Sequence, residues 1–336
     1  MNVDNRYMRF NRICNKSNLY NIIRYTIFTI ICCLSQSSML ANTLHTPSET
    51  MALPATADTI PELPLPNVPK TLQTPADRAG YIITHFWDTM EFSDTLRSYN
   101  KNFMEQSFAN FISVFPYADE QARQTAVGTL LDKAEADSVA YVLLRDVAEK
   151  YLYEPDSPIS SEDYYILFLE RFVDSAILGE YGTLRLRRQL EAARKNRPGM
   201  IAADFAYTTR DGINGTLHKT TTEGDMLLIF YDPDCDHCKE VMGNLQADKA
   251  LSNAIASGKL KVLAIYSGDD QNLWKRTATS LPDNWTVGYE SGVLQENGLY
   301  VLRTMPTLYL LDRNKKVILK EVKDLDNVFS LPETPM

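Results

Sequence analysis

The run Met226-Leu-Leu-Ile-Phe-Tyr231-Asp-Pro-Asp-Cys235-Asp-His-Cys238 joins a continuous apolar hexapeptide to a short turn and two cysteines. An unbroken apolar run of this length is expected for a strand that is buried on both faces of a sheet. The Asp-Pro-Asp that follows breaks the strand, and a helix is expected from Cys235 to about Ala247. The two cysteines are therefore predicted to lie where a buried strand turns into a helix.

The sequence on both sides of this run alternates between strand and helix patterns. Residues 204–217 have the pattern of a short β-hairpin around the turn Arg210-Asp-Gly212. Further segments follow in the order strand (260–266), helix (272–280), short strand (285–289) and core strand (307–311), with a turn at 313–315 and a last strand at 317–319. This order predicts a mixed α/β domain over residues 198–336.

The five cysteines are unevenly distributed. Cys14, Cys32 and Cys33 lie in the first 41 residues, and the rest of the chain contains only Cys235 and Cys238. A structural disulfide framework would use more cysteines at wider spacing. The lone close pair therefore indicates chemistry, although half of a zinc site or an inert disulfide remains an alternative.

Residues 1–41 have the pattern of a secretory signal peptide. Five basic and no acidic residues fall between positions 6 and 24, an apolar segment runs from Tyr25 to Leu34, and small residues lead to a cut near Ala41. The apolar segment is about half of the ~20 residues that span a bilayer, so an uncleaved anchor is less favoured. The prediction is an exported protein of the periplasm or cell envelope, with a membrane or lipid tether as the alternative.

Two further regions separate this segment from the α/β domain. Residues 42–75 contain seven prolines and are expected to form an extended linker. Residues 76–197 are expected to form an all-α domain of about five or six helices, because apolar residues recur at helical spacing. The stripes are Phe108, Phe111, Ile112 and Phe115; Val139, Val142, Leu143 and Val147; and Tyr164, Tyr165, Phe168 and Phe172.

Four groups of residues form a recognisable combination. They are Gly199, Ala203, Asp204 and Phe205 before the first hairpin, Phe230 and Tyr231 before the cysteines, the cysteine pair itself, and Met305-Pro306-Thr307 before a core strand. With these features, residues 199–325 resemble the exported branch of the thioredoxin superfamily, which includes tethered reductases of cytochrome maturation. The resemblance implies a thioredoxin fold, and the helical domain resembles an uncharacterised domain that precedes such modules in related bacterial proteins.

The resemblance and the chemistry of thiols assign roles to the site residues. Cys235 is the expected nucleophile, because the helix macrodipole favours a negative thiolate at its N-terminus. Cys238 is the expected resolving thiol, which releases the mixed disulfide. His237 would tune the thiolate and Pro306 would form the cis-proline loop. Met305 and Tyr231 are the expected substrate-binding residues, and neither a metal nor a cofactor is expected.

Three departures from the family pattern leave the direction of electron flow open. Ile229 stands where thioredoxins have a buried acid, six residues before the first cysteine, and Glu240 is a weak substitute as proton acceptor. Asp234 replaces the usual aromatic residue, and the pair encloses Asp-His rather than Gly-Pro. The predicted reaction is thiol–disulfide exchange with envelope proteins, with reduction slightly favoured on the architecture.

Other functions are less favoured. A net charge of −9 and the lack of a dense basic cluster after the first two dozen residues argue against a nucleic-acid partner. A zinc site would need two more ligands, and a related peroxidase would not have Leu228 and Asp232 in its motif. The remaining alternative is an envelope binding protein that uses its helical domain, with the thioredoxin domain as a scaffold. For the favoured thiol–disulfide exchange, the expected partners are protein disulfides or dithiols and a redox protein of the membrane or envelope.

Overall fold

The computed structural model describes residues 60–322 of the 336-residue chain. The chain divides into two compact units between Arg187 and Arg188. The sequence predicted the domain boundary ten residues later, between residues 197 and 198. The predicted signal peptide and most of the predicted linker lie outside the described residues. Residues 60–69 form neither helix nor strand, and the first described helix begins at Pro75.

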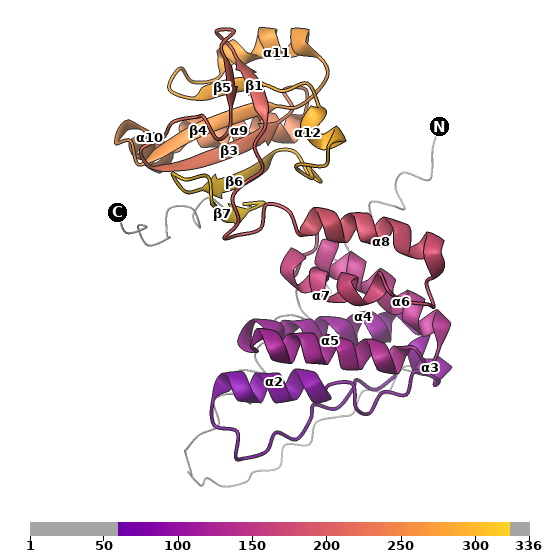
Figure 1. The fold of residues 1–336 in the computed structure, drawn as a ribbon. Helices are drawn as coiled ribbons and strands as arrows, with labels where there is room; N and C mark the ends of the chain where they lie inside the picture. Colours follow the sequence, from indigo (N-terminus) through magenta and orange to yellow (C-terminus); the bar gives the residue numbers. More distant parts are fainter. Residues whose placement is uncertain (1–59, 323–336) are drawn as a thin grey trace, which may run out of the picture. The chain divides into compact units, whose positions relative to one another are not determined.

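The first unit is all-α, as predicted (Figure 1). Side-chain oxygens of Thr74, Asn100, Asp119, Asp137 and Ser161 each accept a hydrogen bond from an amide in the first turn of a helix, which is how such residues start helices. The helices are α2 (Pro75–His85), α3 (Thr95–Ser98), α4 (Lys101–Ser113), α5 (Glu120–Ala134), α6 (Ser138–Ala148), α7 (Glu162–Phe172) and α8 (Gly179–Ala193).

The aromatic stripe of α4 forms part of the core, as its spacing predicted. Phe108 and Phe111 are fully buried, and the ring of Phe108 lies 5.4 Å from that of Phe168 on α7. Phe111 packs edge-on against Phe115 at 4.9 Å. These contacts join α4, α7 and the turn after α4 into one apolar core.

The stripe predicted on α6 is confirmed at Val147 and wrong at Val139. Val139 is 52% exposed, and the buried residues of the helix are Ala140, Tyr141, Leu144, Val147 and Ala148. Asp137 caps the amides of Val139 and Ala140, which places Val139 in the first turn. The Tyr141 ring then packs edge-on against Phe172 at 5.8 Å, so the larger aromatic side chain occupies the core position.

The second unit is a seven-stranded sheet in the order β2-β1-β5-β4-β3-β6-β7. The central strands β3, β4 and β5 are parallel, and the remaining pairs are antiparallel. The elements are β1 (Ala206–Thr209), β2 (Asn214–Thr216), β3 (Asp225–Tyr231), α9 (Asp236–Ala247), α10 (Lys249–Ala256), β4 (Leu260–Tyr266), α11 (Gln271–Thr277), β5 (Thr286–Tyr289), α12 (Val293–Glu296), β6 (Thr307–Leu311) and β7 (Val317–Lys320).

This order confirms the predicted α/β thioredoxin fold after an all-α domain. The strands at 260–266 and 307–311 have the predicted bounds, and β3 begins one residue earlier than predicted. Helix α10 was not predicted; Asp248 caps it directly after α9 ends.

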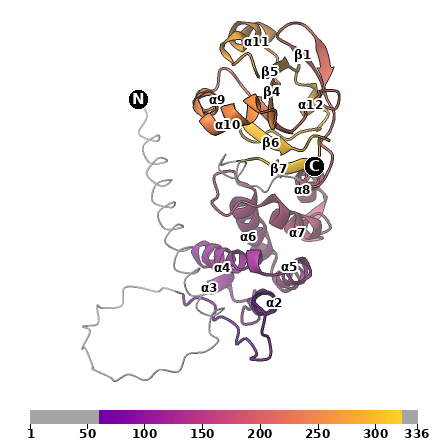
Figure 2. The same cartoon turned by 90° about the vertical axis from the view of Figure 1, so that its left-hand side faces the viewer.

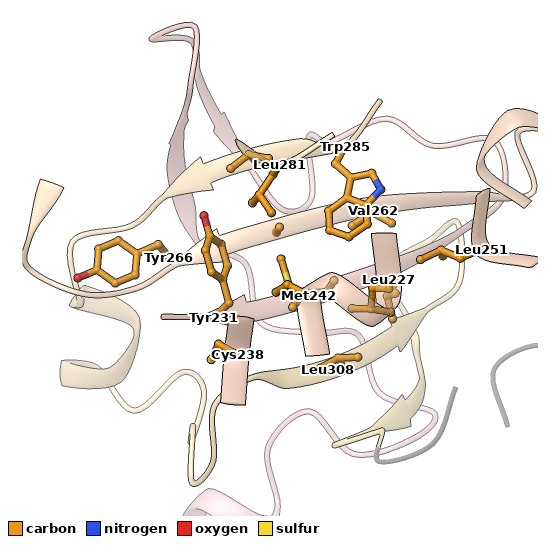
Figure 3. Close-up of a cluster of buried hydrophobic side chains, with 14 of the residues drawn as sticks. Leu227, Tyr231, Cys238, Met242, Leu251, Val262, Tyr266, Leu281, Trp285 and Leu308 are labelled. Carbon is orange, nitrogen blue, oxygen red and sulfur yellow. The ribbon is translucent and has the colours of Figure 1, made fainter. Parts of the chain in front are cut away.

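The sheet has a separate apolar core on each face. Side chains alternate along β3, so that Leu227, Ile229 and Tyr231 face one side and Met226, Leu228 and Phe230 the other. We call the first cluster the helix-side core, because α9, α10 and α11 pack on it (Figure 3). The second, the hairpin-side core, contains Phe205, Tyr207, Leu294, Tyr300 and Tyr309. Figure 2 shows α9 and α10 on one side of the strands and α12 on the other.

Candidate active site

Cys235 occupies the N-cap position of α9. Its backbone is extended (φ −82°, ψ 122°), and its sulfur accepts a hydrogen bond from the Cys238 amide at an N–S distance of 3.4 Å. The side chain is half-buried, so a reagent can reach it. The first amides of a helix have no partner within the helix, and they favour negative charge at this point. The position suits a thiolate nucleophile.

Cys238 lies one turn further on and is 1% exposed. It packs into the helix-side core beside Tyr231 and Met242 (Figure 3), and its sulfur accepts a hydrogen bond from the Asp232 amide at 3.4 Å. Burial raises the pKa of this thiol to about 12, because the thiolate would lose its hydration. Both cysteines are free thiols, and they differ in access, because Cys235 is half-buried and Cys238 is buried.

The loop at Met305–Pro306 reaches the same place from 70 residues away. The Met305–Pro306 peptide bond is cis, and the Met305 carbonyl oxygen lies 4.0 Å from the Cys235 sulfur. Strand β6 starts at the next residue, Thr307, and pairs with β3. The strand pairing therefore brings the predicted nucleophile and the predicted cis-proline loop together.

Tyr231 and His237 occupy different surroundings from those expected. Tyr231 is 3% exposed and lies beneath α9, and burial raises the pKa of its phenol. The His237 side chain is 67% exposed, and its Nδ1 lies 3.9 Å from Glu240 Oε2, which is also exposed. Tyr231 therefore stands behind the cysteines, and His237 and Glu240 face solvent. The substrate contact of Tyr231 and the tuning role of His237 remain predictions.

A pocket of about 380 Å³ opens beside the resolving cysteine. It lies between the active-site turn, α9 and the segment after α11. Its lining consists of Tyr231, Asp232, Pro233, Cys238, Lys239, Met242, Gly243, Gln246, Thr277, Ser280 and Leu281. The thiol of Cys238 thus has a route to water that does not pass through Cys235.

Asp232 is a site residue for which the sequence predicted no contact with Cys238. Its amide binds the Cys238 sulfur, its Oδ1 accepts from the Asp234 amide at 2.9 Å, and it lines the pocket. By contrast, Ile229 is fully buried in the helix-side core and brings no polar group to the thiol. The available signal was an acid directly after the buried strand.

No group of three His, Cys, Asp or Glu side chains suited to a metal ion occurs within residues 60–322. His218 lies beside the hairpin, with its Nε2 2.7 Å from the Ala202 carbonyl oxygen and its side chain 40% exposed. His85 contacts Asp88 in the helical unit. In the same described range, no helix has the length and apolar content that crossing a membrane requires.

Comparison with known proteins finds one matching family of domains and several similar structures. A domain of unknown function (DUF5106) matches residues 33–196. A thioredoxin-like protein from Bacteroides caccae is 32% identical, with a TM-score of 0.74 over 80% of this chain and 97% of that one. The C-terminal domain of an uncharacterized protein from Bacteroides fragilis is 40% identical over 40% of this chain and 94% of its own, with a TM-score of 0.38. The thioredoxin domain of a thiol-disulfide oxidoreductase from Bacteroides vulgatus is 17% identical over 40% and 95%, with a TM-score of 0.35. No curated protein matches.

Proposed function

Because the chain belongs to the thioredoxin-like proteins, we propose that it exchanges thiols and disulfides with other proteins through Cys235 and Cys238. The observation that carries this proposal is the pairing of a reachable sulfur with a buried one. Cys235 caps α9 opposite the Met305 carbonyl, and Cys238 is one helical turn behind it. A protein disulfide can approach the first sulfur but not the second.

In the reducing direction, the Cys235 thiolate attacks one sulfur of a substrate disulfide, and the other sulfur leaves as a thiolate. Cys238 then attacks the Cys235 sulfur in the mixed disulfide. The second substrate sulfur leaves, and two electrons have passed from the dithiol to the substrate. The oxidising direction is the same sequence in reverse. Neither step requires a cofactor.

The Met305 backbone supports binding of an extended substrate. Its carbonyl oxygen is close to the reactive sulfur, and a substrate strand can pair with the chain at this loop. Reduction is slightly favoured over oxidation or isomerisation, on the resemblance of the architecture. The proposed substrates and redox partner are proteins of the periplasm or cell envelope, on the strength of the signal-peptide pattern in residues 1–41.

The two cysteines give a matched pair of variants that tests the proposal. Cys235→Ser should abolish insulin reduction, because the nucleophile is gone. Cys238→Ser should retain the first attack and accumulate mixed disulfides, which non-reducing electrophoresis detects. Wild-type protein that neither reduces insulin nor oxidises a dithiol peptide would contradict the proposal.

The reduction potential of the Cys235–Cys238 couple, measured against glutathione, gives the direction. A value near about −270 mV is that of a thioredoxin-type reductant, and one near about −120 mV is that of a strong oxidant. Opposing local charges act on this value. Asp234 and Asp236 disfavour a thiolate, whereas the Lys239 ammonium, 3.1 Å from Asp236, offsets part of their charge.

A second candidate is an envelope interaction protein with the α/β unit as scaffold. One observation favours it: Tyr181 is 93% exposed and Leu184 is 52% exposed, one turn apart on α8. Such side chains are common at protein contacts. Partner binding that both cysteine variants retain, together with a wild-type protein inactive in exchange, would support this candidate.

A further inference from the structure

The resolving thiol must lose a proton before it can attack. Cys238 is buried, and with its pKa raised to about 12 only roughly one molecule in 10⁵ carries the thiolate at pH 7. A thiolate is the form that attacks a disulfide. The proposed exchange therefore needs a group that takes this proton in the mixed disulfide.

The neighbouring carboxylates differ in their access to that thiol. Glu240 is 73% exposed beside His237, and Asp236 is 98% exposed and pairs with Lys239. Asp232 alone among the acids of residues 225–248 lines the pocket that Cys238 also lines. Its own amide is in contact with the Cys238 sulfur.

We propose that Asp232 accepts the proton of Cys238 during resolution, directly or through a water molecule in the pocket they share. It replaces in function the buried acid whose position Ile229 occupies. This inference rests on the proposed thiol–disulfide exchange. A carboxylate has two acceptor oxygens, so the hydrogen bond from the Asp234 amide to Oδ1 leaves acceptor capacity for the proton.

The step conserves atoms and electrons. The S–H bond of Cys238 breaks, and its proton passes to the Asp232 carboxylate. The sulfur then bonds to the Cys235 sulfur, and the substrate sulfur leaves as a thiolate that takes up a proton. Asp232 returns its proton to solvent through the open pocket.

Several other titratable groups face this centre and shape any pH profile. The Asp232 charge acts on both the Cys238 thiol and the Tyr266 phenol. The groups around the turn are Tyr231 from β3, Asp234 from the turn, Cys235, Asp236, His237 and Lys239 from the start of α9, Tyr266 from β4, and Asp269 and Asp270 before α11. Asp236→Asn removes an equal charge without altering the pocket, and it serves as the matched control.

The test follows two phases in the stopped-flow reaction of the reduced full chain, with Cys14, Cys32 and Cys33 replaced by Ser, with 5,5′-dithiobis(2-nitrobenzoate). The first release of thionitrobenzoate reports attack by Cys235, and the second reports resolution by Cys238. Asp232→Asn should slow the second phase at pH 7 by roughly 100-fold, the lower range for loss of a general base. The rate should then rise with pH as hydroxide takes the proton. Asp236→Asn should leave this phase close to wild type.

A second measurement uses the full chain with Cys14, Cys32, Cys33 and Cys235 replaced by Ser, so that Cys238 is the only thiol that iodoacetamide can alkylate. Burial is the main cause of the raised pKa of Cys238, and the negative charge of Asp232 adds to it. Asp232→Asn should therefore make Cys238 more acidic and its alkylation faster, while resolution becomes slower. A residue that only maintained the turn would not produce these opposite signs.

Asn at 232 can still accept the Asp234 amide, and Ala cannot. If Asp232→Asn resolves like wild type while Asp232→Ala is slow, Asp232 only holds the turn, and the inference is overturned. Unchanged alkylation in Asp232→Asn would overturn it as well. If the wild type releases no second thionitrobenzoate and no substrate is reduced, the proposed exchange fails, whereas the alkylation result still shows whether Asp232 and Cys238 are coupled.

Discussion

The two faces of strand β3 differ in how their buried polar groups are paired. In the hairpin-side core, the Tyr300 hydroxyl donates to the Ala203 carbonyl at 2.8 Å, and the hydroxyls of Tyr207 and Thr220 lie 2.6 Å apart. In the helix-side core, Tyr231 Oη and Trp274 Nε1 are buried, and the contact between these two side chains does not reach full hydrogen-bond geometry. The buried thiol and the 380 Å³ pocket lie on this second face.

This contrast suggests that one face of β3 contributes mainly to stability and the other face to the chemistry of the site. Buried polar groups in native proteins are nearly all paired, and the exceptions concentrate where a site needs room or reactivity. Tyr207 and Tyr300 on the hairpin side follow the rule, whereas Tyr231, which lines the pocket together with Cys238, is less well paired. We therefore expect substitutions on the hairpin side to lower stability, and those around the pocket to change reactivity.

The largest effect is expected from Phe230→Ala. Phe230 is fully buried in the hairpin-side core, with its ring 4.9 Å from that of Tyr300 and 5.7 Å from that of Phe205. Removing the ring leaves a cavity and should lower the free energy of unfolding by about 3–5 kcal/mol. Urea unfolding of the full chain, followed by circular dichroism, measures the change. A loss below about 1 kcal/mol would show that this side is not the stabilising one.

The next effect concerns pH and the buried thiol. Burial raises the folded-state pKa of Cys238 from 9.0 to about 12. The neutral thiol therefore stabilises the fold fully below about pH 9, and that contribution is lost as the pH rises toward 12. The reduced wild type should lose a few kcal/mol more than Cys238→Ala between pH 9 and 12, measured by urea unfolding at each pH. If the free energy of unfolding changed with pH in the same way for both proteins, the thiol would ionise equally easily in the folded and unfolded states.

A smaller loss is expected at Arg210. Its guanidinium is largely buried and donates to the carbonyls of Leu281, Pro282 and Trp285 at 3.1, 2.7 and 3.0 Å, so it holds the segment that borders the pocket. Arg210→Met should cost about 2–3 kcal/mol, because these carbonyls lose a charged donor. Arg210→Lys should lose less stability than Arg210→Met but more than none, because an ammonium group cannot donate to several carbonyls in the planar geometry of a guanidinium. Thermal unfolding of the wild type and both variants checks this order of stability. Equal melting temperatures for Arg210→Met and the wild type would contradict it.

The smallest effects compare two tyrosines directly. Tyr300→Phe breaks the hydrogen bond to Ala203 and should cost about 1 kcal/mol. Tyr231→Phe removes a buried hydroxyl whose contact with Trp274 does not reach full hydrogen-bond geometry, so it should be neutral or stabilising by up to about 1 kcal/mol. The same unfolding assay measures both. A destabilised Tyr231→Phe would show that this hydroxyl has a partner, such as a water in the pocket.

The sheet could be predicted from sequence because its central strands are long apolar runs. Residues 226–231, 260–266 and 307–311 contain only two residues that are not apolar or aromatic, Lys261 and Thr307, and each range forms a strand. Which face of a helix is buried was harder to predict. On α6, the apolar spacing predicted a buried Val139, whereas the residue that packs against Phe172 in the core is Tyr141.

The candidate site was predictable where side chains carry the signal. The cysteine spacing and the Met305–Pro306 loop are visible as letters in the sequence. The hydrogen bond from the Asp232 amide to Cys238 is not, because every residue except proline has that amide. The outward direction of His237 and Glu240 depends on the rotation of α9, which the burial of Cys238, Met242 and Leu245 sets.

The N-cap position of Cys235 has a consequence for observing the protein at work. The sulfur that reacts is also the acceptor for the Cys238 amide, so each change in its bonding changes the first turn of α9. A thiolate accepts that amide more strongly than a disulfide sulfur does. The Cys238 amide is therefore a built-in reporter, whose nitrogen-15 chemical shift and hydrogen-exchange rate would follow turnover without a label on either sulfur.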